Sequence, residues 1–205
     1  MDTAFLITAA ATLFVVLDPP GLVPMFIALT RGMSPDRRRT IAQRGCLIAA
    51  GILTVFALSG EAVLGFIGIT IHAFRIAGGI LLFLTALDML FERRTQRREG
   101  QQAEPEHDIS VFPLATPLIA GPGAIATMIL LVGQAGGDWA ATGAVIGLMF
   151  VVVAVTFVFL LAADTFERWL GRTGTLVITR LLGMLLAALS VQFVIDGVKG
   201  TGLVG

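Results

Sequence analysis

Two short stretches rich in proline and glycine interrupt long hydrophobic runs, and they resemble one another. Six of the eight prolines of the chain lie in these stretches. The first reads Asp18-Pro19-Pro20-Gly21-Leu22-Val23-Pro24, and the second contains Pro113, Pro117 and Gly121-Pro122-Gly123. Because a proline has no N–H to donate to the carbonyl four residues earlier, helices break or kink at these positions. Any fold of this chain must therefore accommodate two broken helices.

The composition indicates that both breaks lie in a membrane. Hydrophobic residues make up 56% of the 205 residues and charged residues only 14%, which is too little polar surface for a soluble domain of this size. Backbone groups freed inside a membrane cannot face lipid, so they are buried in protein or line a polar cavity. Paired interrupted helices of this kind are typical of the binding sites of secondary transporters.

The remaining composition argues against several other classes of function. The net charge is zero and the charges are confined to short hydrophilic patches, which disfavours a nucleic-acid surface. The single cysteine, Cys46, allows no internal disulfide. His72 and His107 are far apart, and no metal-ligand spacing surrounds them. We therefore expect no metal, no cofactor and no nucleic-acid partner.

The hydrophobic runs predict an all-α membrane protein with six transmembrane helices, the first and fourth broken at the midplane. The run from Ala4 has no basic region before it, so we expect a retained helix and not a signal peptide. Ser34 followed by Pro35 predicts the start of the second helix. Residues 60–70 are too short to span separately and are interpreted as an interfacial or re-entrant turn. The predicted spans are 4–29, 45–59, 73–91, 109–132, 140–163 and 176–194.

The order of the motifs indicates an internal repeat. Pro20-Gly21 matches Pro122-Gly123 at an offset of 102 residues, and Arg75-Ile76-Ala77-Gly78 matches Arg180-Leu181-Leu182-Gly183 at an offset of 105. Three helices per repeat is an odd number, so the second copy must enter the membrane from the opposite side. We predict two inverted three-helix repeats, residues 1–91 and 109–205, joined by a polar linker at 92–108.

The placement of the arginines predicts the orientation. With both termini outside, 11 of the 14 basic residues fall in inside segments, as the positive-inside rule requires. These are Arg31, Arg37, Arg38, Arg39, Arg44, Arg93, Arg94, Arg97, Arg98, Arg168 and Arg172. The prediction is a multi-pass protein of the bacterial inner membrane whose linker is cytoplasmic.

Four motifs resemble the MarC family of integral membrane proteins. They are Asp18-Pro19-Pro20-Gly21 with Pro24 and Phe26, the run from Phe74 to Leu82, the run from Pro117 to Ala124, and Gln192-Phe193-Val194 before Asp196-Gly197. The resemblance covers nearly the whole chain. It implies similarity to LysE-type exporters and, through a described relative, to transporters of small neutral amino acids. The long charged linker is the one departure from the family pattern.

Together the two breaks suit a zwitterionic substrate. The second half of each broken helix would present free N–H groups and the positive end of the helix dipole to a carboxylate. The first halves end in free carbonyls, which suit an ammonium group or a cation, and the glycines allow a ligand to approach the backbone. We predict alternating-access transport or export of a small neutral amino acid. The candidate substrate-binding residues are Asp18, Pro19, Pro20, Gly21, Pro24, Gly121, Pro122 and Gly123.

Asp18 admits two roles that are compatible with each other. As a counter-charge or a titratable proton carrier, it would couple the substrate to a proton or sodium gradient. As a structural residue, it would be the N-cap of the second half-helix before the prolines.

The other charged positions leave alternatives open. Arg75 and Arg180 suit gating, or else snorkelling or a structural ion pair. Asp88 and Asp196 are expected to be capping or interfacial residues at span ends. Gly143 and Gly147 have the GxxxG spacing of close helix packing, and a homodimer through this face is a further alternative.

Two other classes of function fit parts of the sequence. A passive pore or a non-transporting membrane scaffold would have the same apolar composition. An intramembrane hydrolase would need a nucleophile and a base, for which Ser59 and His72 are the sole pair, and no HExxH or GxSxG motif occurs. We expect no enzymatic activity.

Overall fold

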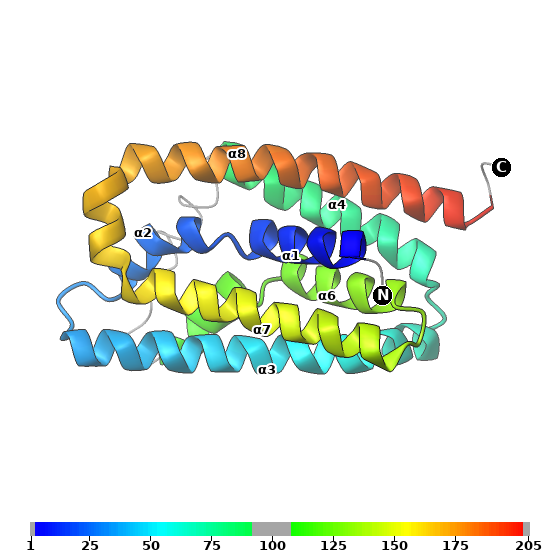
Figure 1. Cartoon of the computed structure of the whole chain (residues 1–205), viewed down its shortest axis with the longest axis horizontal. Helices are drawn as coiled ribbons and strands as arrows, with labels where there is room; N and C mark the ends of the chain where they lie inside the picture. Colours follow the sequence, from blue (N-terminus) through cyan, green and yellow to red (C-terminus); the bar gives the residue numbers. More distant parts are fainter. Residues whose placement is uncertain (1–2, 92–107, 203–205) are drawn as a thin grey trace.

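The computed structural model of the chain describes residues 3–91 and 108–202, and these form a bundle of helices without strands (Figure 1). The predicted linker lies outside the described residues, except for its last residue, Asp108. The helices are α1 (Thr3–Leu17), α2 (Pro19–Leu29), α3 (Pro35–Ile67), α4 (Ile71–Leu90), the wide-turn helix η1 (Ser110–Ile119), α6 (Pro122–Gln134), α7 (Trp139–Leu161) and α8 (Ala163–Gly200).

Side-chain caps fix where several of these helices begin. The Ser34 hydroxyl accepts the Arg37 N–H at 3.4 Å with Pro35 in the first helical position, so the predicted start of the second helix is confirmed. Thr70 caps α4 by accepting the Ala73 N–H at 3.2 Å. Asp138 caps α7 by accepting the Ala140 N–H at 2.8 Å. Each cap satisfies a backbone donor that the first helical turn leaves free.

Within the described residues, five segments are long and apolar enough to cross a membrane, with α1 and α2 counted as one. A sixth is added if η1 and α6, which are bent by 56° at their junction, form one broken span. Large hydrophobic side chains on the outside of the bundle are exposed, for example Phe66 at 92% and Ile7 at 66%. The prediction of an all-helical membrane protein is therefore confirmed.

The predicted turn at residues 60–70 is wrong, because α3 continues through it to Ile67. Gly60 is a packing residue in this helix, since a Cβ there would lie 2.5 Å from Cγ1 of Ile129 in α6. The helix ends at Gly68, whose φ of 83° is left-handed. Ile69 then donates to the Leu64 carbonyl at 2.9 Å, as in a Schellman motif.

The last helix is also longer than the predicted span 176–194. α8 begins at Ala163 and changes direction at Gly171, where φ is 64° and ψ is 176°. Figure 1 shows the part before Gly171 lying across one end of the bundle. The N- and C-terminal ends both lie toward the opposite end.

α4 and α8 are antiparallel and pack so closely that glycines of each helix contact the backbone of the other. A Cβ at Gly79 would lie 2.8 Å from the Ser190 carbonyl oxygen, and one at Gly183 would lie 3.3 Å from the Ala86 carbonyl oxygen. Near the other end of the pair, a Cβ at Gly197 would lie 3.1 Å from the His72 carbonyl oxygen. Glycine is therefore required on both helices for this contact.

The GxxxG pair of α7 does not pack in this way. At Gly143 and Gly147 a Cβ would meet nothing within 4 Å, and both residues are exposed. The predicted close helix packing at this pair is therefore wrong within one copy of the chain, and the homodimer stays a prediction.

Two helix breaks and the candidate substrate site

The first break is centred on Asp18, which separates α1 from α2. Its φ of 49° and ψ of 62° are left-handed, and among the described residues it is the one non-glycine with positive φ. Aspartate tolerates this conformation because its short side chain bonds to nearby backbone. Here the carboxylate oxygen Oδ1 accepts the Gly21 N–H at 3.2 Å. The predicted N-cap role of Asp18 is confirmed.

Gly21 and the two prolines complete this break. A Cβ at Gly21 would overlap the Asp18 carboxylate, so glycine is required for the cap. Pro19 and Pro20 have no N–H, so the Val15 and Val16 carbonyls lose the donors that a continuous helix would supply. Pro24 lies one turn further along, inside α2.

The second break follows an irregular helix. Phe112 and Thr116, each of which precedes a proline, have extended backbone angles inside η1. The helix compensates with wider turns, because Leu114 donates to the Ile109 carbonyl at 3.3 Å and Ala120 donates to the Ala115 carbonyl at 2.8 Å. The Ile109 carbonyl thus keeps a partner although Pro113 cannot supply one.

Gly121 turns the chain from η1 into α6. A Cβ at this position would lie 2.6 Å from the Pro117 carbonyl oxygen, so a side chain would collide with backbone. Pro122 occupies the first helical position, and Gly121 offers no side-chain cap to the N–H groups of the first turn. The two half-helices therefore differ, because the Asp18 carboxylate caps α2 whereas, among the described residues, α6 has no side-chain cap at its N-cap position, Gly121.

The structure brings the two breaks together. A Cβ at Gly123, in the first turn of α6, would lie 3.9 Å from Cγ1 of Val16, just before the first break. It would also lie 3.4 Å from Oγ1 of Thr85 in α4. From this region α2 and α6 run toward opposite ends of the bundle (Figure 1). The two helices therefore begin near one another.

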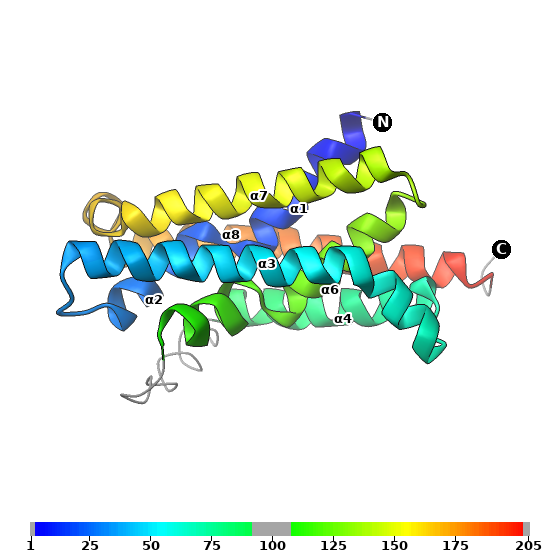
Figure 2. The same cartoon turned by 90° about the horizontal axis from the view of Figure 1, so that it is seen from below.

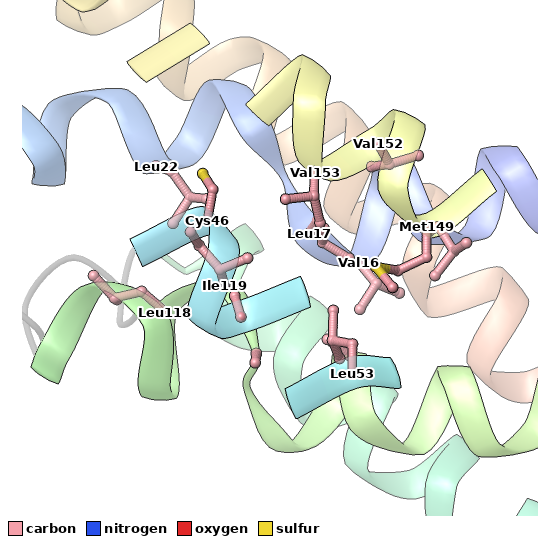
Figure 3. Close-up of a cluster of buried hydrophobic side chains, with 14 of the residues drawn as sticks. Val16, Leu17, Leu22, Cys46, Leu53, Leu118, Ile119, Met149, Val152 and Val153 are labelled. Atoms are coloured by element: carbon pink, nitrogen blue, oxygen red, sulfur yellow. The ribbon is translucent and has the colours of Figure 1, made fainter. Parts of the chain in front are cut away.

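Buried apolar side chains surround the breaks. Figure 3 shows Leu17 and Leu22 from either side of the first break among side chains of α3, η1 and α7. The labelled members of this cluster are at most 5% exposed. Polar groups at the breaks are thus enclosed by a hydrophobic shell, which strengthens their electrostatic interactions.

Thr85 is a residue of this region that sequence reasoning missed. Its hydroxyl donates to the Leu81 carbonyl at 2.9 Å and lies beside the uncapped first turn of α6. A lone threonine in an apolar helix carries no distinctive pattern, and only the tertiary contact with Gly123 reveals it.

The predicted charged candidates lie outside the two breaks. Arg75 lies about two turns along α4 from Leu82, which contacts Gly123. Its side chain is half-buried, and among the described residues its Nε has no hydrogen-bond partner. Arg180 is exposed on α8. Asp196 lies near the end of α8, where Oδ1 accepts from Nε2 of Gln192 at 2.8 Å.

The residues considered for a hydrolase have other structural roles. The Ser59 hydroxyl donates to the Val55 carbonyl of its own helix at 2.7 Å. The His72 ring packs against Gly200 of α8. Across the part of the chain that the structure describes, no three His, Cys, Asp or Glu side chains gather as a metal site would require.

Comparison with known proteins identifies the family. A model described as "MarC family integral membrane protein" matches residues 3–201. The chain belongs to the MarC family. This confirms the resemblance drawn from the four sequence motifs.

Relatives of this MarC-family chain come from archaea and bacteria. A UPF0056 membrane protein of Methanocaldococcus jannaschii is 38% identical over 98% of both chains. UPF0056 membrane protein YvbG of Bacillus subtilis is 37% identical over 98% of this chain and 97% of its own. UPF0056 inner membrane protein YhgN of Escherichia coli is 36% identical over 95% of this chain and 96% of its own. No solved structure matches the chain.

Proposed function

We propose that this MarC-family protein is a secondary transporter or exporter of a small neutral amino acid, working by alternating access at the paired breaks. The observation that carries the proposal is the contact of the two breaks, where Gly123 of α6 adjoins Val16 of α1. Two helix N-termini that start together inside a membrane protein form a polar site in an apolar surround. Such a site is typical of secondary transporters.

The difference between the two half-helices suggests how a zwitterion binds. The uncapped N-terminus of α6 would receive the carboxylate, which such a helix end stabilises by up to about 2 kcal/mol. The Asp18 carboxylate would face the ammonium group while it caps α2. Pro19, Pro20, Gly21, Pro24, Gly121 and Pro122 would shape the backbone around the ligand.

Asp18 would also couple transport to a gradient. It is 2% exposed, and a carboxylate buried at this depth is costly unless it is functional or bonded. Binding a proton, or facing a sodium ion, would link its charge to the occupancy of the site.

The α4–α8 contact supports the inverted repeat of residues 1–91 and 109–205. The repeat matches each residue of α4 with the residue of α8 that lies 105 positions later, so Gly79 corresponds to Met184 and Thr85 to Ser190. The Gly79–Ser190 contact therefore predicts a symmetry-related contact between Thr85 and Met184. The observed contact of Ala86 with Gly183 lies one residue away on each helix. A two-fold axis between α4 and α8, in the membrane plane, is consistent with both contacts.

The arrangement of charges supports an orientation with both termini outside. The arginines of α3 lie at the end of the bundle opposite to the two termini (Figure 1). A reporter that is active only in the periplasm should therefore be active when fused after Gly202 and inactive within the 92–108 linker. The reverse result would overturn the orientation and the cytoplasmic linker.

Flux measurements test the proposed function directly. Proteoliposomes loaded with glycine, alanine or serine should release substrate faster than protein-free liposomes, with a rate that saturates and responds to a proton or sodium gradient. Unsaturable flux without gradient dependence would indicate a pore. Absence of flux for every small amino acid would indicate a non-transporting scaffold and would overturn the proposal.

A further inference from the structure

One ion pair joins three segments at the arginine-rich end of the bundle. Nη1 of Arg38 in α3 lies 3.0 Å from Oδ1 and 2.7 Å from Oδ2 of Asp164, at the start of α8. The same guanidinium lies 5.5 Å from the ring centroid of Phe26 in α2. Arg38 thus connects the half-helix α2, the long helix α3 and the segment of α8 that crosses the end of the bundle.

A second ion pair lies at the same end. Arg44, two turns along α3, lies 3.3 Å from Oδ2 of Asp108, just before η1. Next to it, a Cβ at Gly45 would lie 3.2 Å from the Ser110 carbonyl oxygen. The first part of α3 therefore contacts both elements that lead to the breaks from this side, α2 and η1.

The opposite end is different. Of the residues that the structure describes there, Glu61, Asp138 and Lys199 form no ion pair. Figure 2 shows the α3–α4 turn and the C-terminal end of α8 at this end, away from the start of α3. Both ion pairs described above therefore lie at the arginine-rich end.

We propose that the Arg38–Asp164 pair, with Phe26 against the guanidinium, is a gate at the arginine-rich end, and that the structure represents the state closed at that end. The gate holds α2 against α8 and covers the breaks. It opens when the ion pair separates and α2 moves away from α3. The inference rests on the proposed alternating access, which requires one such closure on each side.

The rate at which Cys46 is labelled can be used to detect the movement of α2. Cys46 in α3 is 5% exposed, and in Figure 3 its side chain points toward Leu22 of α2. We therefore expect Cys46 to react slowly with a thiol reagent while α2 is in place. Movement of α2 would expose it to water from the arginine-rich side.

Labelling with a membrane-impermeant maleimide tests the gate. In inverted vesicles, Arg38→Ala should raise the labelling rate of Cys46 about fivefold to thirtyfold, from the combined loss of an ion pair and a cation–π contact. Right-side-out vesicles should show no such rise. Arg39→Ala is the matched control, because Arg39 is an exposed arginine next to Arg38, and it should label at the wild-type rate. Cys46→Ala should abolish the signal.

Two further variants keep the test decisive if Arg38→Ala does not insert. Asp164→Asn removes the charge from the other side of the pair, where the side chain is 56% exposed, and should also raise the rate. The exchange Arg38→Asp with Asp164→Arg should lower it again. Wild-type labelling in Asp164→Asn, or no recovery in the exchange variant, would overturn the gate. The assay needs no substrate, so failure of the gate and failure of transport are separate results.

Discussion

The N–H of Gly21 donates to the carboxylate of Asp18 at 3.2 Å, and the two residues are so close that a Cβ on Gly21 would overlap that carboxylate. The cap therefore requires both residues at once, an acidic or amide side chain at one position and no side chain at the other. Replacing Asp18 by asparagine separates its structural role from its charge, because the asparagine side chain can cap the helix but is uncharged.

Asp18→Asn should keep the fold and change transport. Asparagine caps helices about as well as aspartate and tolerates left-handed φ, so the midpoint of thermal unfolding should be nearly unchanged. If Asp18 binds the substrate ammonium, affinity should weaken by about 1.5 to 3 kcal/mol, or roughly tenfold to a hundredfold. If it carries the coupling proton, gradient-driven accumulation should disappear while exchange of internal for external substrate continues.

Both outcomes are measured in proteoliposomes with and without an imposed gradient. Asp18→Ala, which also removes the cap, serves as the comparison and should lower stability by about 1 kcal/mol. A folded Asp18→Asn protein with unchanged affinity and unchanged gradient dependence would leave Asp18 with a structural role alone.

Gly21→Ala should destabilise the protein by about 1 to 3 kcal/mol, because the added methyl group displaces the Asp18 carboxylate. Thermal unfolding in detergent measures the change. Gly51→Ala is the matched control, since Gly51 is exposed in α3 and a Cβ there meets nothing within 4 Å. That substitution should stabilise the helix by about 0.5 to 1 kcal/mol.

The effects of substitutions at Asp18 and Gly21 on stability should also be coupled. In an Asp18→Ser background the shorter side chain leaves room, so the cost of Gly21→Ala should fall. Equal costs in both backgrounds would mean that the overlap is relieved in some other way.

Asp108 should give a pH-dependent contribution to stability. Hydrogen bonds from the Ser110 hydroxyl and backbone N–H, and then the charge of Arg44, hold the pKa of Asp108 below its ordinary value. The charged form is thus favoured in the folded protein, so its contribution is present above the unfolded-state pKa. It is lost as the pH falls through the lower folded-state pKa.

Asp108→Asn should therefore lower the unfolding midpoint at neutral pH by an amount that shrinks on acidification. Unfolding of both proteins at several pH values checks this. Asp36→Asn is the control, because Asp36 is an exposed aspartate in the first turn of α3. A difference between wild type and Asp108→Asn that stays constant with pH would contradict the assignment.

Local chemistry made part of this structure predictable. The Ser34-Pro35 start and the Asp18 cap depend on residues within one turn of each other, so both could be read from the sequence. The prolines predicted both breaks, and the repeat of the motifs led us to expect a shared site. The contact between Gly123 and Val16 places the two breaks next to one another, and the shared substrate site stays a prediction.

Other features depended on distant partners. Residues 60–70 were predicted to form a turn, but they continue α3, and Gly60 packs against Ile129 of α6. Gly143 and Gly147 have the spacing of close helix packing, but no helix that the structure describes packs against them. The Arg38–Asp164 pair joins residues separated by 126 positions, which no local pattern indicates.

The contact between α4 and α8 has a mechanical consequence. Glycines at both ends of this pair place each helix against the backbone of the other, so the helices cannot slide or tilt far without a collision. Under the proposed alternating access, we therefore expect the change of access to be a rotation in which α4 and α8 keep their positions relative to one another. Spin labels on the outer faces of α4 and α8 would keep their separation through such a cycle, whereas labels on α2 and α3 would move apart.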